Sequence, residues 1–340
     1  DSVFLHHTGN MFGIGCSVFS EKGIEKINGL KQRKNAKGYI VLLPELDWLE
    51  KFNIKIDNKI KMLLQQYWPG NLTVILKVPE NSFDLVSKDQ KVAFRVPTSS
   101  FLRDFIFDIG EPIISTSINI SEEKPSNSLE EIRKKHQKWF EMEVLPKNVI
   151  EIDAKPSTII EFKKDRELSC LREGNVRFKK IRNSYKKPLI LIVCTGNICR
   201  SPMAEYLLRQ HIMKDNLPFR VASAGFINSG SRISENSYLV LKNAGINAIS
   251  HTSTMIDKKL VDDSWLILTM EKAHKIKLAR TDPNIGHKVF TISEFCGKHF
   301  CIPDCDIMDP YTMEIYFYRE TFRKLKERVD YLVEKLTEML

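Results

Sequence analysis

Apolar and polar residues are patterned differently in the two halves of the chain. In the first half, short apolar runs stand at hairpin-length spacings and are mixed with amphipathic helical segments. From residue 188 onward, apolar runs of strand length alternate regularly with segments of helical periodicity. The first pattern predicts a twisted mixed α/β sheet, and the second predicts a doubly wound parallel sheet with helices on both faces. The predicted fold class is therefore α/β, in two domains.

The first half supplies most of the predicted strands, at residues 3–7, 39–43, 72–78, 92–96, 112–119, 149–152, 158–160 and 168–172. Helices are expected at residues 20–30, 56–67, 101–107 and 128–143. The last of these helices begins with Ser128 and Glu131 in the spacing of a capping box. The glycine-rich residues 8–16 predict a turn.

In the second half, strands are expected at residues 189–193, 219–223, 265–270 and 288–292. Helices are expected at residues 202–213, 235–244, 272–278 and 314–340, the second of them capped by Ser234. Between the halves, the basic and polar run 178–188 ends in Pro188 and predicts a short linker. We therefore place the domains at residues 1–182 and 183–340.

Composition narrows the classes of protein and partner. No apolar run approaches the roughly 18 residues of a membrane-spanning helix, so we expect no membrane partner. The net charge of +9 favours phosphates, nucleotides or RNA as partners, although a lysine-rich surface that only aids solubility explains it equally well. The seven cysteines show no framework spacing and no export signal precedes them. That pattern predicts a cytoplasmic protein with reduced thiols.

The clearest chemistry lies in residues 193–202. Cys194 follows a predicted buried strand, and Arg200 stands at the start of a predicted helix with five residues between them. A helix N-terminus and a guanidinium both stabilise a thiolate, so Cys194 is a candidate nucleophile. Arg200 offers parallel donors to a phosphoryl group. The spacing predicts a phosphate-binding loop with a catalytic cysteine.

The residues inside this loop fit the same chemistry. Gly196 and Asn197 tolerate the left-handed backbone that such a loop requires. Ser201 is expected to cap the following helix, with Pro202 at its first position. A nest for phosphate oxygens is expected from the backbone N–H groups of Thr195, Gly196, Asn197, Ile198 and Cys199.

Other interpretations of the cysteines are simpler. A lone cysteine after a strand is usually a small buried hydrophobe. Cys194 and Cys199 can form half of a metal site, but no second pair lies at a suitable spacing. The three cysteines and His299 within residues 296–305 match no zinc-finger spacing, and we predict no metal there.

A cysteinyl-phosphate mechanism also needs an acid for the leaving oxygen, and an Asp-Pro-Tyr motif stands at residues 309–311 before the last helix. With this motif and the Cys-x5-Arg-Ser-Pro loop, residues 188–340 resemble the low-molecular-weight protein tyrosine phosphatases. The resemblance implies that Cys194 is the nucleophile, that Arg200 binds the phosphoryl group, and that Asp309 is the general acid and then the base. It implies a phosphorylated protein as partner and no cofactor.

The same resemblance assigns supporting roles. Ser201 is expected to support the thiolate, Asn197 to hold the shape of the loop, and Tyr311 to line the slot for the substrate. Ile198 favours phosphotyrosine, because a bacterial branch that acts on phosphoarginine has threonine at this position. Phosphoarginine remains the alternative substrate, since the downstream motifs resemble that branch too. The resemblance also implies that oxidation can pair Cys199 with Cys194.

In the first half, the basic run 31–37 lies near the glycine-rich turn. This pattern fits either a nucleotide-binding loop or a solvated charge run. Lys31, Arg33 and Lys37 suit a triphosphate, and Arg95 and Arg172 can clamp a carboxylate or phosphate. Hydrogen bonds to ribose and phosphates are expected from Ser117, Asn119, Ser157 and Thr158.

Seven blocks within residues 1–175 occur in the order seen in the YrdC-like threonylcarbamoyl-adenylate synthases, namely residues 8–15, 31–37, 68–73, 92–97, 115–119, 156–160 and 171–174. The resemblance implies a twisted sheet with a positively charged cavity. It implies that the domain condenses threonine, bicarbonate and ATP, with Mg²⁺ as cofactor, and supplies the product for tRNA modification. The implied nucleotide- and threonine-binding residues are Thr8, Lys31, Arg33, Lys37, Arg95, Ser117, Asn119, Ser157 and Arg172.

The first half departs from that family pattern at several positions. Residues 7–13 lack the acidic residue and the second threonine of the family's first block, and Ile118 replaces an alanine. The helix that the resemblance leads us to expect before the first strand is absent from this sequence, which opens at Asp1. The alternative is a degenerate domain that binds a nucleotide or RNA without turnover.

Overall fold

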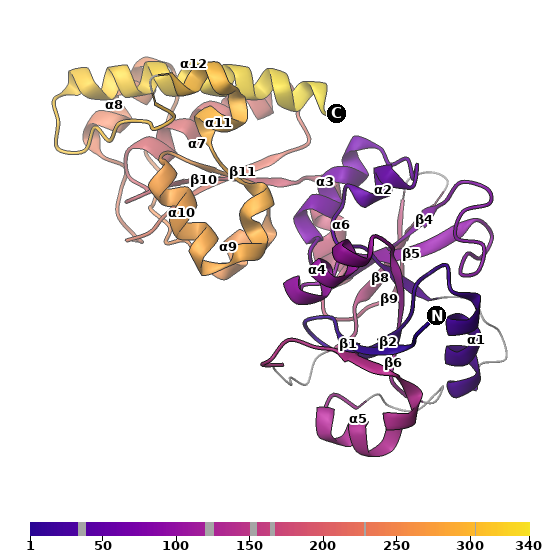
Figure 1. Ribbon diagram of the computed structural model, residues 1–340. Coiled ribbons are helices and arrows are strands. Elements are labelled where there is room, and N and C mark those ends of the chain that lie inside the picture. The colour runs from indigo at the N-terminus through magenta and orange to yellow at the C-terminus, as the bar shows by residue number, and fades with distance from the viewer. Residues whose placement is uncertain (33–38, 120–125, 150–154, 164–166, 228, 303) are drawn as a thin grey trace. The chain divides into compact units, whose positions relative to one another are not determined.

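The computed structural model describes residues 1–32, 39–119, 126–149, 155–163, 167–227, 229–302 and 304–340 (Figure 1). The chain divides into two compact units, one formed by residues 1–56 and 67–182 and the other by residues 57–66 and 183–340. Residues 57–66, which lie within the predicted first domain, therefore pack with the second unit. They form most of helix α3 (Asn58–Tyr67).

The first unit is built on a mixed sheet of nine strands in the order β7-β1-β2-β6-β3-β5-β4-β8-β9. The strands are β1 (Phe4–His7), β2 (Phe12–Gly15), β3 (Ile40–Leu42), β4 (Leu72–Lys77), β5 (Lys91–Arg95), β6 (Ile113–Ser117), β7 (Met142–Val144), β8 (Thr158–Phe162) and β9 (Leu168–Arg172). Its helices are α1 (Glu21–Leu30), α2 (Trp48–Lys51), α4 (Ser100–Ile109) and α5 (Leu129–His136), followed by the short turn η1 (Gln137–Trp139). The predicted twisted mixed sheet is confirmed.

Two predicted elements of this unit were wrong in extent. The turn predicted at residues 8–16 ends at Met11, because Phe12–Gly15 pairs with β1 as an antiparallel strand. The helix predicted at residues 128–143 stops at His136, and residues 142–144 join the sheet as β7. Ser128 is the N-cap residue but makes no capping hydrogen bond, and Glu131 instead accepts from Ser126 Oγ at 2.8 Å. The predicted strand at 149–152 lies largely outside the described residues.

The second unit has a parallel sheet of four strands in the order β11-β10-β12-β13, as the alternating pattern predicted. Its strands are β10 (Leu189–Cys194), β11 (Arg220–Gly225), β12 (Ser264–Thr269) and β13 (Val289–Thr291). Its helices are α7 (Arg200–Lys214), α8 (Glu235–Asn243), α9 (Lys258–Asp263), α10 (Lys272–Thr281), α11 (Ile292–Cys296) and α12 (Ile315–Glu338), with the short turns η2 (Pro283–Lys288) and η3 (Lys298–Cys301).

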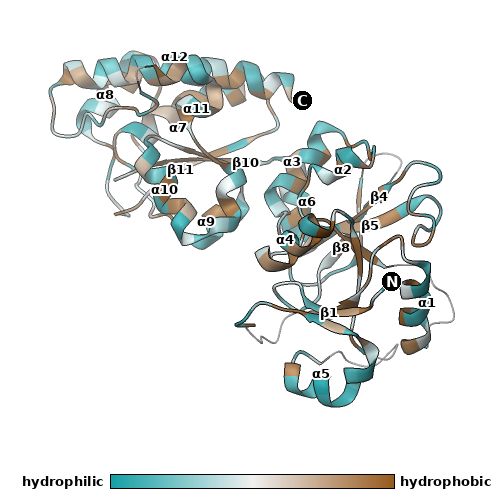
Figure 2. Cartoon of the chain, viewed as in Figure 1, coloured by the Kyte–Doolittle hydropathy of each residue, from teal (hydrophilic) through white to brown (hydrophobic). Residues whose placement is uncertain are grey.

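Successive side chains of β10 point alternately into two apolar cores on opposite faces of that sheet. Ile190 and Ile192 lie in the core beneath α7 and α12, whereas Leu191 and Val193 lie in the core beneath α9 and α10. Figure 1 shows these helix pairs on the two sides of the sheet, and Figure 2 shows apolar strands beneath helices with polar outer faces. This double burial explains why β10 reads as a continuous apolar run.

The linker predicted at residues 178–188 is instead helix α6 (Phe178–Lys186). Ile181 and Tyr185 stand four residues apart, and both are buried. Residues at this spacing lie on one face of a helix, and burial of that face stabilises the helix. The polar composition of the rest of the segment is the reason why it was predicted to be a linker. No helix among the described residues is long and apolar enough to cross a membrane.

Candidate functional site

The predicted phosphate-binding loop lies at the carboxyl end of β10, where Cys194 is the last residue of the strand. Helix α7 begins at Arg200, and both Cys194 and Arg200 are buried. Ligands of parallel α/β sheets bind beyond the carboxyl ends of the strands, and a helix N-terminus at that edge favours an anion. The loop thus has the position that its sequence predicted.

Asn197 organises the loop from its centre. Its backbone is left-handed, with φ of 54°, and its side chain is fully buried. The Nδ2 group donates to Ser201 Oγ at 2.9 Å and to Ser223 Oγ at 2.7 Å, and Oδ1 accepts from Thr254 N at 2.8 Å. Three hydrogen bonds, to α7, to β11 and to the segment at Thr254, therefore hold this one amide in place.

The Cys194 sulfur is held by two groups of its own loop. Ser201 Oγ lies 2.9 Å from Cys194 Sγ, and the backbone N–H of Asn197 donates to the sulfur at 3.2 Å. A hydroxyl and an amide N–H can both donate hydrogen bonds to a sulfur that acts as a nucleophile. The geometry suits a nucleophilic sulfur.

Arg200 is 1% exposed and joins several segments. Its Nη1 donates to Glu271 and to the carbonyl of Ile307 at 2.9 Å, and its Nη2 donates to Asp309 and to Thr195 Oγ1 at 3.3 Å. Its Nε is buried and has no partner among the described residues. The structure therefore brings Cys194, Arg200 and Asp309 to one site, together with a guanidinium that retains one unused donor.

Two candidate arginines of the first unit, Arg95 and Arg172, lie near each other. Arg95 is buried and donates to the carbonyl of Gly70 at 2.8 Å and to Asn10 Oδ1 at 3.0 Å. Burial, and then the nearby Arg172, lower the pKa of Arg95 to about 10. Arg172 donates to the carbonyl of Ser157 at 2.9 Å, and burial lowers its pKa as well. Arg172 lies close enough to disfavour the charge of Arg95, and two neighbouring guanidinium groups suit an anion.

Lys31 also belongs to the first unit, and its ammonium group is hydrogen-bonded to other residues of the protein. It is 2% exposed, and its ammonium group donates to the carbonyl of Asn119 at 2.7 Å and to that of Ser117. Thr8 is also buried and donates to Asn10 Oδ1 at 2.8 Å. Arg33 and Lys37 lie outside the described residues.

Comparison with known proteins covers both units. A family model described as low molecular weight phosphotyrosine protein phosphatase matches residues 189–340. The YrdC-type family model, described as telomere recombination, matches residues 2–174. The chain belongs to both families, one in each half.

Relatives of the phosphatase domain are of two kinds. The chain is 39% identical over 149 residues to a protein-arginine-phosphatase of Geobacillus stearothermophilus, covering 43% of this chain and 95% of that protein. It is 34% identical over 133 residues to a low molecular weight protein-tyrosine-phosphatase of Acinetobacter johnsonii, covering 39% and 86%. The YrdC-type domain is 33% identical over 144 residues to a threonylcarbamoyl-AMP synthase of Buchnera aphidicola, covering 41% and 82%.

One predicted local role in the phosphatase domain was wrong. Helix α7 begins at Arg200 with Cys199 as its N-cap residue, so Ser201 does not cap the helix and Pro202 is its third residue. The Ser201 hydroxyl is engaged by Cys194 and Asn197 instead. The tertiary contact outcompetes the local capping bond that a serine at this position would otherwise make.

Cys199 of the phosphatase loop is buried, and its thiol donates to Ser234 Oγ at 3.3 Å. Burial raises the pKa of Cys199, and burial also raises the pKa of the neighbouring Tyr318 to about 12. Cys199 is therefore held as a thiol. Pairing with Cys194 under oxidation stays a prediction.

Sequence reasoning missed several residues of the phosphatase site. Glu271 precedes α10 and His274 is the third residue of that helix, and Thr195 is bonded through its side chain and not only through its backbone. Ser223 donates to the buried Glu205, and His251 Nε2 lies 2.8 Å from the Asn197 carbonyl oxygen. The position of Glu271 after β12 was an available signal, because the carboxyl end of each parallel strand faces the site.

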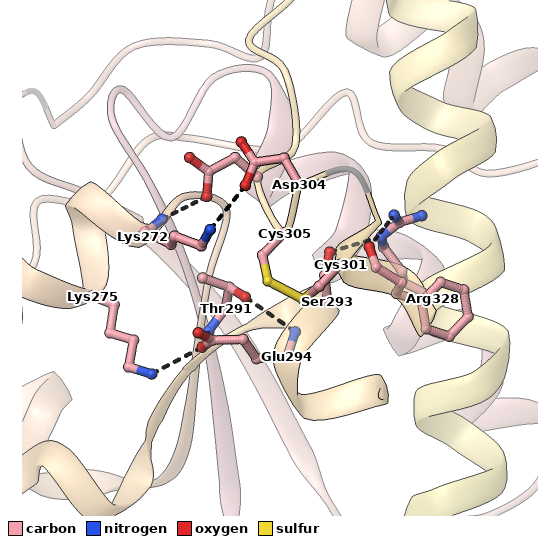
Figure 3. The surroundings of a disulfide bond; sticks show 11 residues. Lys272, Lys275, Thr291, Ser293, Glu294, Cys301, Asp304, Cys305 and Arg328 are labelled. Carbon is pink, nitrogen blue, oxygen red and sulfur yellow. Dashed lines mark hydrogen bonds and ion pairs between the residues drawn. A yellow bond between two sulfur atoms is a disulfide. The ribbon is translucent and has the colours of Figure 1, made fainter. Parts of the chain in front are cut away.

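The loop before Asp309 contains a disulfide between Cys301 and Cys305 (Figure 3). The predicted reduced state is therefore wrong for these two cysteines. The main chain of Lys272 donates to Asp306 at 2.7 Å, and Arg328 of α12 donates to the carbonyl of Phe300 at 3.2 Å. The disulfide thus belongs to a segment that is fixed from both α10 and α12. The described residues contain no group of three metal-binding side chains.

Proposed function

We propose that the phosphatase domain hydrolyses phosphorylated protein side chains through a cysteinyl-phosphate intermediate. The observation that carries this proposal is the Cys194 sulfur, held by Ser201 and the Asn197 amide beside the buried guanidinium of Arg200. The thiolate attacks phosphorus, and the bond from phosphorus to the leaving group breaks. The loop amides and Arg200 stabilise the negative charge on the transferring oxygens.

Asp309 supplies and then recovers one proton in this scheme. In the first step its protonated carboxyl gives the proton to the leaving atom of the substrate. In the second step the carboxylate takes a proton from water as the water oxygen attacks phosphorus. The sulfur–phosphorus bond then breaks, and the thiolate and inorganic phosphate are released. No cofactor is needed.

The direct test is Cys194→Ser, which we expect to abolish hydrolysis of an aryl phosphate. Serine is nearly isosteric with cysteine but remains protonated at neutral pH, so the nucleophile is lost and the loop is kept. Cys296→Ser is the matched control, because Cys296 is buried elsewhere in the same domain and donates to the Arg328 carbonyl at 3.1 Å. Turnover by Cys194→Ser would overturn the mechanism.

Within this proposal, phosphotyrosine is the first choice of substrate and phosphoarginine the alternative. Ile198 and the exposed Tyr311 supply apolar surface that suits an aryl group. The arginine-phosphatase relative at 39% identity supports the alternative. Phosphotyrosine and phosphoarginine peptides of one sequence, compared on wild type and Ile198→Thr, separate the two. We expect the variant to shift kcat/KM toward phosphoarginine.

For the YrdC-type domain we propose formation of threonylcarbamoyl-adenylate from threonine, bicarbonate and ATP for tRNA modification. The neighbouring guanidinium groups of Arg95 and Arg172 support it, because the substrates are anionic. The described residues contain no group of three side chains that could hold Mg²⁺. We place both activities in the cytoplasm, where ATP, threonine and tRNA occur.

Pyrophosphate release from ATP, with and without threonine and bicarbonate, tests this second activity. We expect release that depends on both. ATP binding without threonine-dependent release would favour the alternative, a degenerate module that binds a nucleotide or RNA without turnover.

A further inference from the structure

His274 lies beside the phosphatase loop, although the mechanism above does not use it. It is the third residue of α10, which follows strand β12. Its ring is 6% exposed and stacks on Phe226, with ring centroids 5.4 Å apart. The backbone N–H of Phe226 donates to the Thr195 carbonyl at 2.8 Å. The imidazole is therefore held against the loop on two sides.

A continuous chain of hydrogen bonds joins this imidazole to Arg200. His274 Nε2 lies 3.0 Å from Thr195 Oγ1, and Arg200 Nη2 donates to the same oxygen at 3.3 Å. A guanidinium can only donate, so the Thr195 hydroxyl must accept from Arg200. The hydroxyl hydrogen and the second lone pair of Thr195 Oγ1 are then available for a hydrogen bond with His274.

The unpaired groups distinguish the two possible tautomers of the ring. His274 Nδ1 is buried without a partner among the described residues. With the proton on Nε2, both the bare Nδ1 and the Thr195 hydrogen lack a partner. With the proton on Nδ1, only the Nδ1–H group lacks a partner among the described residues, because Nε2 accepts the Thr195 hydrogen. Polarisation by Arg200 strengthens the second arrangement, since the guanidinium makes the hydroxyl a better donor.

Four charged groups face this imidazole, from α7, from the residue before α10 and from the loop before α12. Glu271, Asp306 and Asp309 raise the pKa of His274, and Arg200 lowers it, but burial is the largest influence. The net effect lowers the pKa. His274 is thus neutral at neutral pH, and it becomes charged only below the ordinary histidine range.

We propose that neutral His274 accepts the Thr195 hydroxyl hydrogen and so positions Arg200 for phosphoryl binding. This inference rests on the proposed phosphatase function. His274 is a positioning residue and touches no reacting atom. When it is protonated, Nε2 becomes a donor, the Thr195 hydroxyl loses its acceptor, and a second positive charge stands near Arg200. The positioning is therefore lost in acid.

The tautomer is tested by nitrogen–proton NMR correlation of the histidine rings in the full chain. His251 provides an internal reference, because its Nε2 faces a carbonyl oxygen and must carry the proton. We expect the opposite tautomer for His274, with the proton on Nδ1, and a change in its signal in Thr195→Val. A protonated Nε2 in His274 at neutral pH would overturn the proposal. This readout does not depend on phosphatase activity.

Kinetics test the role itself, with His274→Phe to remove the acceptor while keeping a ring against Phe226. His274→Gln is the rescue variant, because its amide oxygen can accept. We expect His274→Phe to lower kcat for an aryl phosphate about tenfold at pH 7, and His274→Gln to lower it only about threefold. The ratio of wild type to His274→Phe should fall toward one as pH drops. A kcat ratio that stays constant with pH contradicts the proposal, and so do equal losses of kcat in the two variants when both are folded. An inactive wild type contradicts the proposed phosphatase function instead.

Discussion

Arg200 Nη2 donates to a carboxylate oxygen of Asp309, which lies 109 residues further along the chain. The residue proposed to bind phosphate and the residue proposed to supply the proton are thus paired with each other. Asp309 must carry a proton to act as the acid in the first step. A phosphate dianion that enters the loop competes with Asp309 for the guanidinium of Arg200.

Asp309→Ala separates the acid from the phosphate site. Aryl phosphates with good leaving groups need little protonation, so we expect them to lose about tenfold in kcat. Alkyl or weakly acidic phenol leaving groups should lose about a thousandfold. A plot of kcat against the pKa of the leaving group, in wild type and variant, measures this difference. Asp304→Ala is the matched control, because Asp304 pairs with Lys272 on the surface. Parallel plots for wild type and Asp309→Ala would exclude Asp309 as the acid.

Glu271 is the second carboxylate on Arg200, and its removal should strengthen anion binding. Phosphate and Glu271 compete for one buried guanidinium, and Glu271 also repels the dianion. We expect Glu271→Gln to bind inorganic phosphate roughly fivefold more tightly as a competitive inhibitor. Glu294→Gln, on the same sheet edge but paired with Lys275, should leave the inhibition constant unchanged. Weaker phosphate binding in Glu271→Gln would show that Glu271 orients Arg200 more than it competes.

These contacts show how far sequence reasoning reaches. The loop was predictable because Cys194, Asn197 and Arg200 lie within seven residues and their chemistry follows from local spacing. Asp309 was found only through its motif. Glu271 was not found, because no periodicity indicates which side chain after a strand turns toward the loop. The side chain must be placed by the packing of α10 against the sheet.

In the first half, too, the sequence pattern did not predict which side chains are buried. Lys31 was predicted to face a triphosphate, but its ammonium group is used on the carbonyls of Ser117 and Asn119. A basic run in the sequence does not distinguish a buried lysine from a solvated one. Burial of Ile181 and Tyr185 likewise made a helix of a segment whose composition indicated a linker.

The disulfide between Cys301 and Cys305 should stabilise the phosphatase domain modestly. It closes a short loop, for which the chain-entropy relation gives about 2 kcal/mol of unfolding free energy. We expect a dithiol reductant, or the double variant Cys301→Ser and Cys305→Ser, to lower the Tm of this domain by several degrees. Contacts from Lys272 and Arg328 keep the loop in place, so kcat should change less than twofold. A reductant-dependent shift that persists in the double variant would assign the effect to another cysteine.

His6 gives the YrdC-type domain a defined acid sensitivity. Its ring is fully buried in β1, where only the backbone of Ile14, among the described residues, offers it a hydrogen bond. Burial first, and then His7 and Arg95, lower the pKa of His6 to about 3. The ring is therefore neutral in the folded domain and becomes charged near pH 6.5 when the domain unfolds.

The sign of the effect follows from proton binding. Between pH 6.5 and pH 3 the unfolded state binds the additional proton, so stability is fully present above pH 6.5 and falls as the solution is acidified. The slope for one such group is about 1.4 kcal/mol per pH unit. Urea unfolding followed by pulsed hydrogen exchange in peptides covering residues 3–15 measures it. His6→Leu should reduce the slope by about one proton, whereas His136→Leu on the surface helix α5 should not. An unchanged slope in His6→Leu would show that His6 is not the source of the acid sensitivity.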